Sequence, residues 1–255
     1  MTYLEIEARI KNAPQLDFGN LISDVIDLFK NIWLKGFVTV LLIMGSALGI
    51  IFIFTLIGLA PQALTLQETF NLANYYDNYF MSALYGIPQT ILLSTFTLAY
   101  LASFYRLCRH FILGEMSDEN YFYFFKKEYF SKVFMLGIIY TAIAVAAQLM
   151  FLLPYIYVYI PLSFFAVVLA NNPEMGELDI AKLSFKLGNK KWFFTFISMF
   201  VAVIMGMLGI LACGVGILFT VSIAYLPSFF VYKEVIGLEE INQIKPVETL
   251  NESIF

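Results

Sequence analysis

The fold is decided first by residues 36–60, GFVTVLLIMGSALGIIFIFTLIGLA, a run without a single charged side chain. The hydrocarbon core of a bilayer is about 30 Å thick, and a helix of about 20 apolar residues spans it. This run is therefore long enough to be a transmembrane helix. Five further apolar runs follow along the chain. The sequence predicts an all-α integral membrane protein with six transmembrane helices, at about residues 36–60, 83–107, 133–153, 155–170, 193–213 and 214–232.

The composition of the whole chain also indicates lipid as its solvent. Of the 255 residues, 60% are hydrophobic and only 13% are charged, and the mean hydropathy is +0.79. These values lie outside the usual range of soluble domains. The net charge of -4 and the lack of a basic stripe argue against nucleic acid as a partner. The first 35 residues contain no short apolar core with a cleavage site, so we expect no removable signal peptide.

Lysine and arginine lie on one side of the predicted helices. All 15 fall before the first helix, in the second and fourth connections, or after the sixth helix. Basic connections are retained in the cytoplasm, so we predict an N-in and C-in topology in a bacterial-type inner membrane. The chain then divides into a cytoplasmic segment (1–35), a membrane domain (36–236) and a cytoplasmic tail (237–255).

Short segments recur in the three successive pairs of helices. The even helices contain AYLASF at 99–104, YIPLSF at 159–164 and AYLPSF at 224–229. Amphipathic stretches with a Phe-Lys pair precede the three pairs, at 28–33, 124–129 and 184–192. We interpret this pattern as three repeats of a cytoplasmic amphipathic interfacial helix followed by a transmembrane hairpin. The alternative is chance, since short apolar strings recur readily in so biased a sequence.

Glycines in the first and fifth helices are candidates for helix packing. In lipid, helices associate where small residues let their backbones approach closely. We therefore expect the odd-numbered helices to pack together at these glycines, and simple flexibility is the alternative. The residues are Gly45, Gly49, Gly206 and Gly209.

The chain contains no recognisable catalytic motif. His110 is the only histidine, which excludes zinc sites and other sites built on a histidine pair. No charged residue lies in the middle of a predicted helix, which argues against proton relays and ion-coupled pumps. We expect no catalytic residue, no metal and no cofactor, and therefore no enzymatic activity.

A basic cluster is predicted at the cytoplasmic end of the second helix. Arg106, Arg109 and His110 are spaced by three and four residues, so they share one face of a helix. We predict that they bind phospholipid headgroups of the anionic leaflet. The alternative is that they only anchor the helix at its depth.

A second set of candidates is polar and lies within the membrane. Tyr100, Tyr159 and Tyr225 are predicted at similar depth, where a common axis would give a polar spot for a lipid or a small amphiphile. The alternative is that their hydroxyls bond the backbone near Pro161 or Pro227, where proline removes helix bonds. Their companions are Ser103, Ser163 and Ser228, and the amides Gln89 and Gln148, which we expect to bond to each other between two helices.

Residues 181–192, AKLSFKLGNKKW, precede a glycine-bearing hairpin and the string Tyr225-Leu226-Pro227. This region resembles bacterial multi-span proteins related to the membrane domain of glycerophosphodiester phosphodiesterases. The resemblance covers residues 178–233, with an echo at 18–60. The soluble catalytic domain of the fused members is absent, so the resemblance implies a helical membrane module and carries over no catalytic residue.

Taken together, these features predict a non-enzymatic inner-membrane protein. We interpret it as an accessory or scaffold subunit whose partners are membrane lipids and other envelope membrane proteins. The alternative is a small transporter or lipid-handling protein with a cavity between the three hairpins. An intramembrane enzyme is the third reading.

Overall fold

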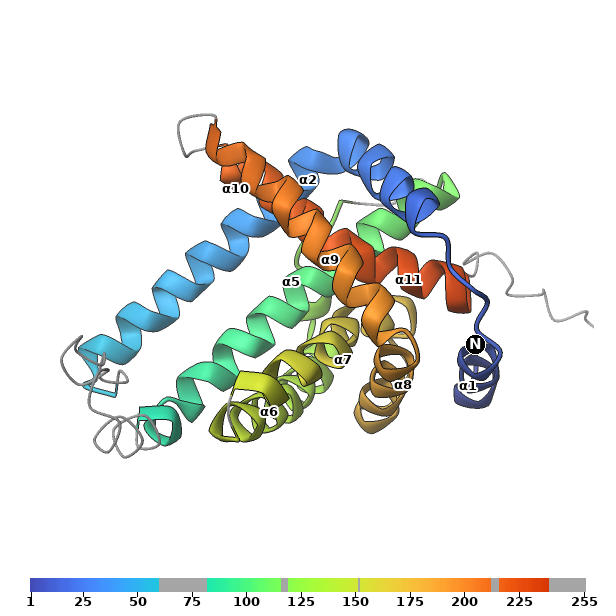
Figure 1. The fold of residues 1–255 in the computed structure, drawn as a ribbon. Coiled ribbons are helices and arrows are strands. Elements are labelled where there is room, and N and C mark those ends of the chain that lie inside the picture. The colour runs from blue at the N-terminus through green and yellow to red at the C-terminus, as the bar shows by residue number, and fades with distance from the viewer. Residues whose placement is uncertain (60–81, 116–118, 151, 212–215, 239–255) are drawn as a thin grey trace, which may run out of the picture.

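The computed structural model describes residues 1–59, 82–115, 119–150, 152–211 and 216–238, which contain helices and no strand (Figure 1). Six segments in these ranges are long and apolar enough to cross a membrane. The all-α class and the six apolar helices are therefore confirmed. The segments are α2 (Phe18–Leu56), α5 (Ile87–Leu113), α6 (Lys127–Leu149), α7 (Leu152–Asn171), α9 (Trp192–Met207) with the 3-10 turn η2 (Leu208–Leu211), and the composite segment Ile217–Ile236.

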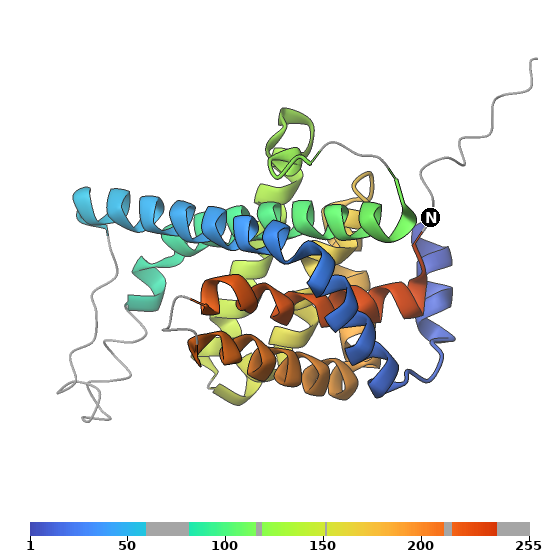
Figure 2. The same cartoon turned by 90° about the horizontal axis from the view of Figure 1, so that it is seen from above.

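The first helix is longer than predicted. α2 begins at Phe18, so the predicted interfacial helix and the first apolar run form one continuous helix across the expected boundary at residues 35 and 36. Asp17 caps its N-terminus, since the Asp17 carboxylate accepts a hydrogen bond from Asn20 N at 2.7 Å. No proline interrupts the segment, so nothing ends the helix between its amphipathic and apolar parts. The helix changes direction between these parts (Figure 2).

The later helix bounds differ by a few residues. Pro154, which stands between the predicted helices 133–153 and 155–170, lies in the first turn of α7, where its missing N–H is not needed. The sixth segment is divided into α10 (Ile217–Thr220), η3 (Val221–Tyr225) and α11 (Leu226–Ile236). Thr220 Oγ1 donates to Gly206 O at 2.5 Å and so joins α10 to α9. The boundary predicted between residues 213 and 214 lies outside the described residues, as does the tail from 239.

The second, fourth and sixth membrane segments along the chain, called even-numbered below, are more buried than the first, third and fifth, called odd-numbered. Within the most apolar 18 residues of each segment, 56% are buried in α5, 56% in α7 and 67% in Ile217–Ile236. The corresponding values are 22% for α2, 33% for α6 and 33% for Trp192–Ile210. The core therefore consists mainly of α5, α7 and α11, and the other three segments expose apolar faces.

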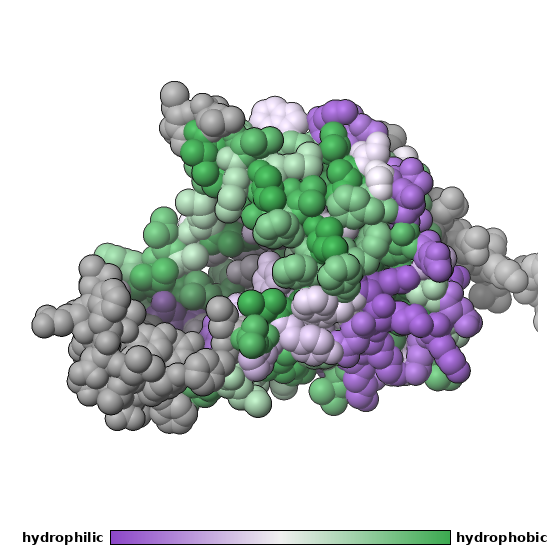
Figure 3. Space-filling model, in the orientation of Figure 1, coloured by the Kyte–Doolittle hydropathy of each residue, from purple (hydrophilic) through white to green (hydrophobic). Residues whose placement is uncertain are grey.

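Two amphipathic helices cover one end of this core. α1 (Tyr3–Lys11) buries Ile6 and Ile10, and α8 (Glu177–Lys190) packs along α7 and against α1 (Figure 1). Lys186 Nζ of α8 donates to Glu7 Oε1 of α1 at 2.5 Å. On the face shown in Figure 3, hydrophilic surface gathers over α1, α8 and the N-terminal part of α2, and hydrophobic surface lies over α9 and the apolar part of α2.

The predicted interfacial helices take three different forms. The first is continuous with α2, as described above. Before α6, the described residues contain only the 3-10 turn η1 (Tyr123–Phe125), because α6 itself already begins at Lys127. Only the third, α8, is a separate amphipathic helix that leads into an apolar one.

Some glycines do lie in close helix contacts, but the prediction that they pack the first, third and fifth helices against one another was wrong. At Gly45 and Gly49 an added Cβ would meet nothing within 4 Å. At Gly206 it would lie 3.3 Å from Thr220 O, and at Gly209 it would lie 2.5 Å from Gly216 O, both in the following segment. The reason is that even-numbered segments occupy the interior. Gly36 of α2 and Gly137 of α6 also lie against these segments, because an added Cβ would clash with Ser222 and with Thr95.

The six segments do not form a parallel bundle. Figure 1 looks almost along the axes of α6 and α8, whereas α2, α5 and α9 lie across the view. In Figure 2, seen from above, α6 lies beneath α2 and α9 and crosses their direction. The outer helices therefore diverge from one another instead of closing around a single axis.

Candidate functional site

The predicted headgroup cluster is divided between the interior and the surface. The Arg106 guanidinium lies over the ring of Tyr123, 3.9 Å from the ring centroid. His110 is buried, and its Nδ1 lies 2.5 Å from Glu115 Oε2. Arg109 is half-buried. His110 therefore does not face lipid headgroups as expected, and headgroup binding stays a prediction for the two arginines.

The three predicted tyrosines do not converge on one axis. Tyr100 is buried among aromatic rings from the segment that follows α5, with its centroid 5.9 Å from that of Phe122 and 4.7 Å from that of Phe125. Tyr159 is exposed and Tyr225 is half-buried, and their hydroxyls lie near each other. Tyr100 therefore lies in another group of rings, and a shared polar spot stays a prediction for Tyr159 and Tyr225.

Two further tyrosines complete a group that we call the phenol cluster. It consists of Tyr140 of α6, Tyr155 and Tyr159 of α7, and Tyr225 of η3. The Tyr140 hydroxyl lies near those of the other three. Sequence analysis missed Tyr140 and Tyr155 because both lie outside the repeated strings. The cluster places four hydroxyls between three segments that are apolar elsewhere.

The three predicted serines are satisfied inside their own helices. Ser103, Ser163 and Ser228 donate to carbonyl oxygens three or four residues earlier, at 2.9, 2.7 and 2.9 Å. The Tyr105 hydroxyl, which no repeat pointed to, donates to Tyr225 O at 2.9 Å and lies 2.9 Å from Ser228 Oγ. The alternative prediction was that the hydroxyl of Tyr100, Tyr159 or Tyr225 bonds the backbone near Pro161 or Pro227. A hydroxyl does bond the backbone near Pro227, but it belongs to Tyr105.

The expected pair of amides is not joined in the described part of the chain. Gln89 is buried, and its Oε1 has no hydrogen-bond partner among the described residues. Gln148 is half-buried. A different polar pair bridges the same two helices, since Thr141 Oγ1 of α6 donates to Ser94 Oγ of α5 at 3.1 Å.

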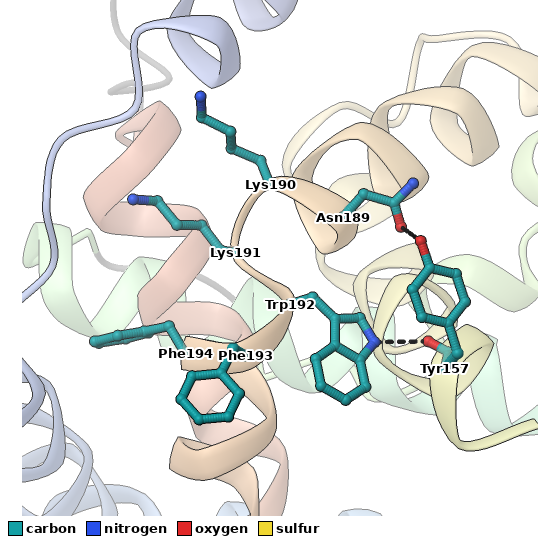
Figure 4. A pocket seen from close by; sticks show the side chains of 7 residues that line it. All are labelled: Tyr157, Asn189, Lys190, Lys191, Trp192, Phe193 and Phe194. Atoms are coloured by element: carbon teal, nitrogen blue, oxygen red, sulfur yellow. Dashed lines mark hydrogen bonds between the residues drawn. The ribbon is translucent and has the colours of Figure 1, made fainter. Parts of the chain in front are cut away.

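An open pocket of about 530 Å³ lies where α8 passes into α9 (Figure 4). We call it the α8–α9 pocket. The side chains of Lys190 and Lys191 extend to one side of it, and the indole of Trp192 and the ring of Tyr157 lie on the other. The lining residues are Tyr157, Asn189, Lys190, Lys191, Trp192, Phe193 and Phe194.

Pro161 determines the aromatic side of this pocket. A proline inside a helix leaves the carbonyl four residues earlier without its N–H partner, and here that carbonyl belongs to Tyr157. Trp192 Nε1 donates to this oxygen at 2.9 Å, and the Trp192 and Tyr157 rings stack with centroids 6.0 Å apart. Gly188 allows the contact, because a Cβ there would lie 2.5 Å from Pro161 Cα. The indole is therefore held in a defined position.

The cationic side of the pocket has no carboxylate partner among the described residues. Lys190 and Lys191 form none of the ion pairs that the described chain contains. Lys191 Nζ donates to a neutral group, the backbone oxygen of Pro14. Partial burial lowers the pKa of Lys191, and the neighbouring charge of Lys190 lowers it further. Two adjacent ammonium groups in this setting attract an anion.

The sequence contains a signal for this pocket. Two lysines and a tryptophan, residues 190–192, stand at the entrance to an apolar run. Lysine and tryptophan side chains in this position are typical of a membrane interface. In the described ranges, no group of three or more His, Cys, Asp or Glu side chains is placed to hold a metal ion.

No protein-family model, no curated protein and no solved structure matches this chain. The resemblance to phosphodiesterase membrane domains therefore stays a prediction.

Proposed function

We propose that the protein is a non-enzymatic, multi-pass inner-membrane protein, an accessory or scaffold subunit that acts through lipids or membrane-protein partners. The observation that carries this proposal is the exposed apolar surface of α2, α6 and α9. The hydroxyls of Ser103, Ser163, Ser228 and Tyr105, by contrast, form hydrogen bonds within the protein. Hydrophilic surface lies at the opposite end, over α1 and α8 (Figure 3). The exposed side chains include Leu41, Met44, Leu48 and Phe52 of α2 and Phe200 and Ile204 of α9.

The proposal includes three hairpins with both termini in the cytoplasm. Chain neighbours α2 and α5, α6 and α7, and α9 and η3 contact each other, as the hairpins require, and α5 also contacts α6 of the next hairpin. In each pair the even-numbered segment is the more buried one, which supports a threefold repeat. The 15 basic residues support the orientation.

Purification of the tagged full-length chain in a mild detergent tests this proposal. Mass spectrometry of the co-eluting material should show either a stoichiometric membrane-protein partner or a lipid enriched over its share in the membrane. Recovery of the chain alone, with lipids in bulk proportion, would contradict the proposal.

The phenol cluster favours one second candidate, a lipid-handling protein. Its four hydroxyls lie among α6, α7 and η3, and Tyr159 is exposed, so the cluster is open to an amphiphile from the lipid side. Phenylalanine at Tyr140, Tyr159 and Tyr225 should then reduce the amount of co-purified lipid. Tyr100→Phe is the matched control, because its hydroxyl belongs to another group of rings. Equal lipid retention in the triple variant and the wild type would retire this candidate.

A further inference from the structure

The α8–α9 pocket combines a fixed aromatic surface with an unneutralised pair of cations. Trp192 is held by its bond to Tyr157 O and by stacking on Phe196, with centroids 5.2 Å apart. Asn189 is tied to the same surface, since the Tyr157 hydroxyl donates to Asn189 Oδ1 at 3.0 Å. The pocket is therefore shaped before any ligand enters.

The surroundings of the pocket change from polar to apolar over a short distance. Lys190 and Asn189 belong to the amphipathic α8, whereas the exposed side chains of Phe193 and Phe200 belong to the apolar α9. A ligand that fills the pocket next to both kinds of surface needs an anionic head and an apolar body. An anionic phospholipid has this chemistry, and basic pockets beside membrane helices bind such headgroups.

We propose that the α8–α9 pocket binds the headgroup of an anionic membrane phospholipid, with Lys190 and Lys191 at the phosphate and Trp192 and Phe193 beside the first part of the acyl chains. This inference rests on the proposed function and names the class of lipid involved. It is separate from the predicted cluster on α5, where Arg106 already lies over an aromatic ring.

Trp192 provides a local reporter for the test. The chain has two tryptophans, and Trp33→Phe leaves Trp192 as the single indole. The full-length variant is reconstituted in phosphatidylcholine vesicles that contain brominated phosphatidylglycerol, and in a second set the bromine is on phosphatidylcholine. Quenching of Trp192 then measures which lipid lies beside the pocket. We expect about a 30-fold preference for phosphatidylglycerol, since each cation near an anionic leaflet contributes roughly a five-fold preference.

Paired lysine variants decide whether the pocket is responsible. Lys190→Gln with Lys191→Gln should reduce the preference to near unity. Lys182→Gln is the matched control, because Lys182 is an exposed lysine of α8 that pairs with Asp179 at 3.6 Å. An unchanged melting temperature of each variant shows that it is folded. An equal loss in the Lys182 variant, or no preference in the parent protein, would overturn the inference.

Soluble anions separate the two sources of phosphate. Inorganic phosphate and glycerol 3-phosphate should leave the quenching unchanged at millimolar concentration if the pocket takes a lipid. Displacement of the brominated lipid by either anion would overturn the assignment to a membrane lipid. If purification yields only a protein partner and the lysine variants lose no preference, the inference fails while the proposed function stands.

Discussion

Pro161 shows how one residue organises its neighbours in two directions. Its ring interrupts the hydrogen-bond ladder of α7 and frees the Tyr157 carbonyl, which then accepts a hydrogen bond from the indole N–H of Trp192. Its Cα also lies where any side chain at position 188 would have to be, which explains the glycine there. The joint between α8 and α9 therefore depends on a residue in a third helix.

The bond between Trp192 and the freed carbonyl can be tested by a double-mutant cycle. Trp192→Phe alone should lower the free energy of unfolding by about 1 kcal/mol, because it leaves the Tyr157 carbonyl without a partner. In a Pro161→Ala background, the new backbone N–H can bond that carbonyl, so the same substitution should cost much less. Thermal unfolding of the four proteins in detergent gives the coupling energy, and a value near zero would contradict this account.

The two glycine environments predict opposite effects of one substitution. Gly188→Ala places a Cβ 2.5 Å from Pro161 Cα and should lower the free energy of unfolding by about 1–3 kcal/mol. Gly45→Ala meets nothing within 4 Å and removes backbone freedom, so it should raise stability by roughly 0.5–1 kcal/mol. Melting temperatures that shift in the same direction for both variants would show that the described packing is wrong.

At the scale of elements, α1 is held mainly by two isoleucines on one face. Ile6→Ala should detach α1 from α8 and cost about 2–4 kcal/mol, since Ile6 is 0% exposed. Leu4→Ala is the control, because Leu4 is 74% exposed and should change stability little. Limited trypsin digestion reports on the detachment, since Arg9 and Lys11 lie in α1. Equal cleavage rates in the two variants would argue against a docked α1.

The contact between α1 and α8 should also depend on alkaline pH. Hydrogen bonds to Glu7 and then to Tyr3 raise the pKa of Lys186 above its ordinary value of 10.5. The contribution of this contact is therefore fully present below pH 10.5 and is lost as the pH rises through the folded-state pKa. Because the isoleucines still hold α1 and an exposed ion pair contributes little, spin labels at Leu4 and Leu178 should show only a slightly wider distance distribution above this pH. In Lys186→Gln the same slight widening should already be present at neutral pH and change little.

The sequence predicted the apolar elements better than the short and amphipathic ones. Uninterrupted apolar runs leave a chain few choices in lipid, so all six segments were found. α1 was missed, although Thr2 and Glu5 form a capping box ahead of Ile6 and Ile10. Tyr100 was grouped wrongly, because its ring partners come from residues 122–125, and only the three-dimensional fold brings them together.

At the scale of the whole molecule, hydropathy gives the length of a helix and not its direction. The crossing of α6 beneath α2 and α9 is set by packing against α5 and α7, which no periodicity in one segment reveals. The separation of polar and apolar surface, by contrast, follows from where charged residues fall in the sequence (Figure 3). Orientation in a membrane is therefore the whole-molecule property that the sequence predicts most directly.

Two exposed leucines at opposite ends of the helices test this orientation. Leu153 lies at the start of α7, next to a connection without basic residues, and is 78% exposed. Leu178 lies in the lysine-rich α8 and is 64% exposed. After Cys108 and Cys213 are replaced by alanine, Leu153→Cys should react with a membrane-impermeant maleimide in intact cells. Leu178→Cys should react only after permeabilisation, because basic segments are retained in the cytoplasm. The reverse pattern would overturn the N-in and C-in topology, and with it the side of the membrane on which the α8–α9 pocket meets its lipid.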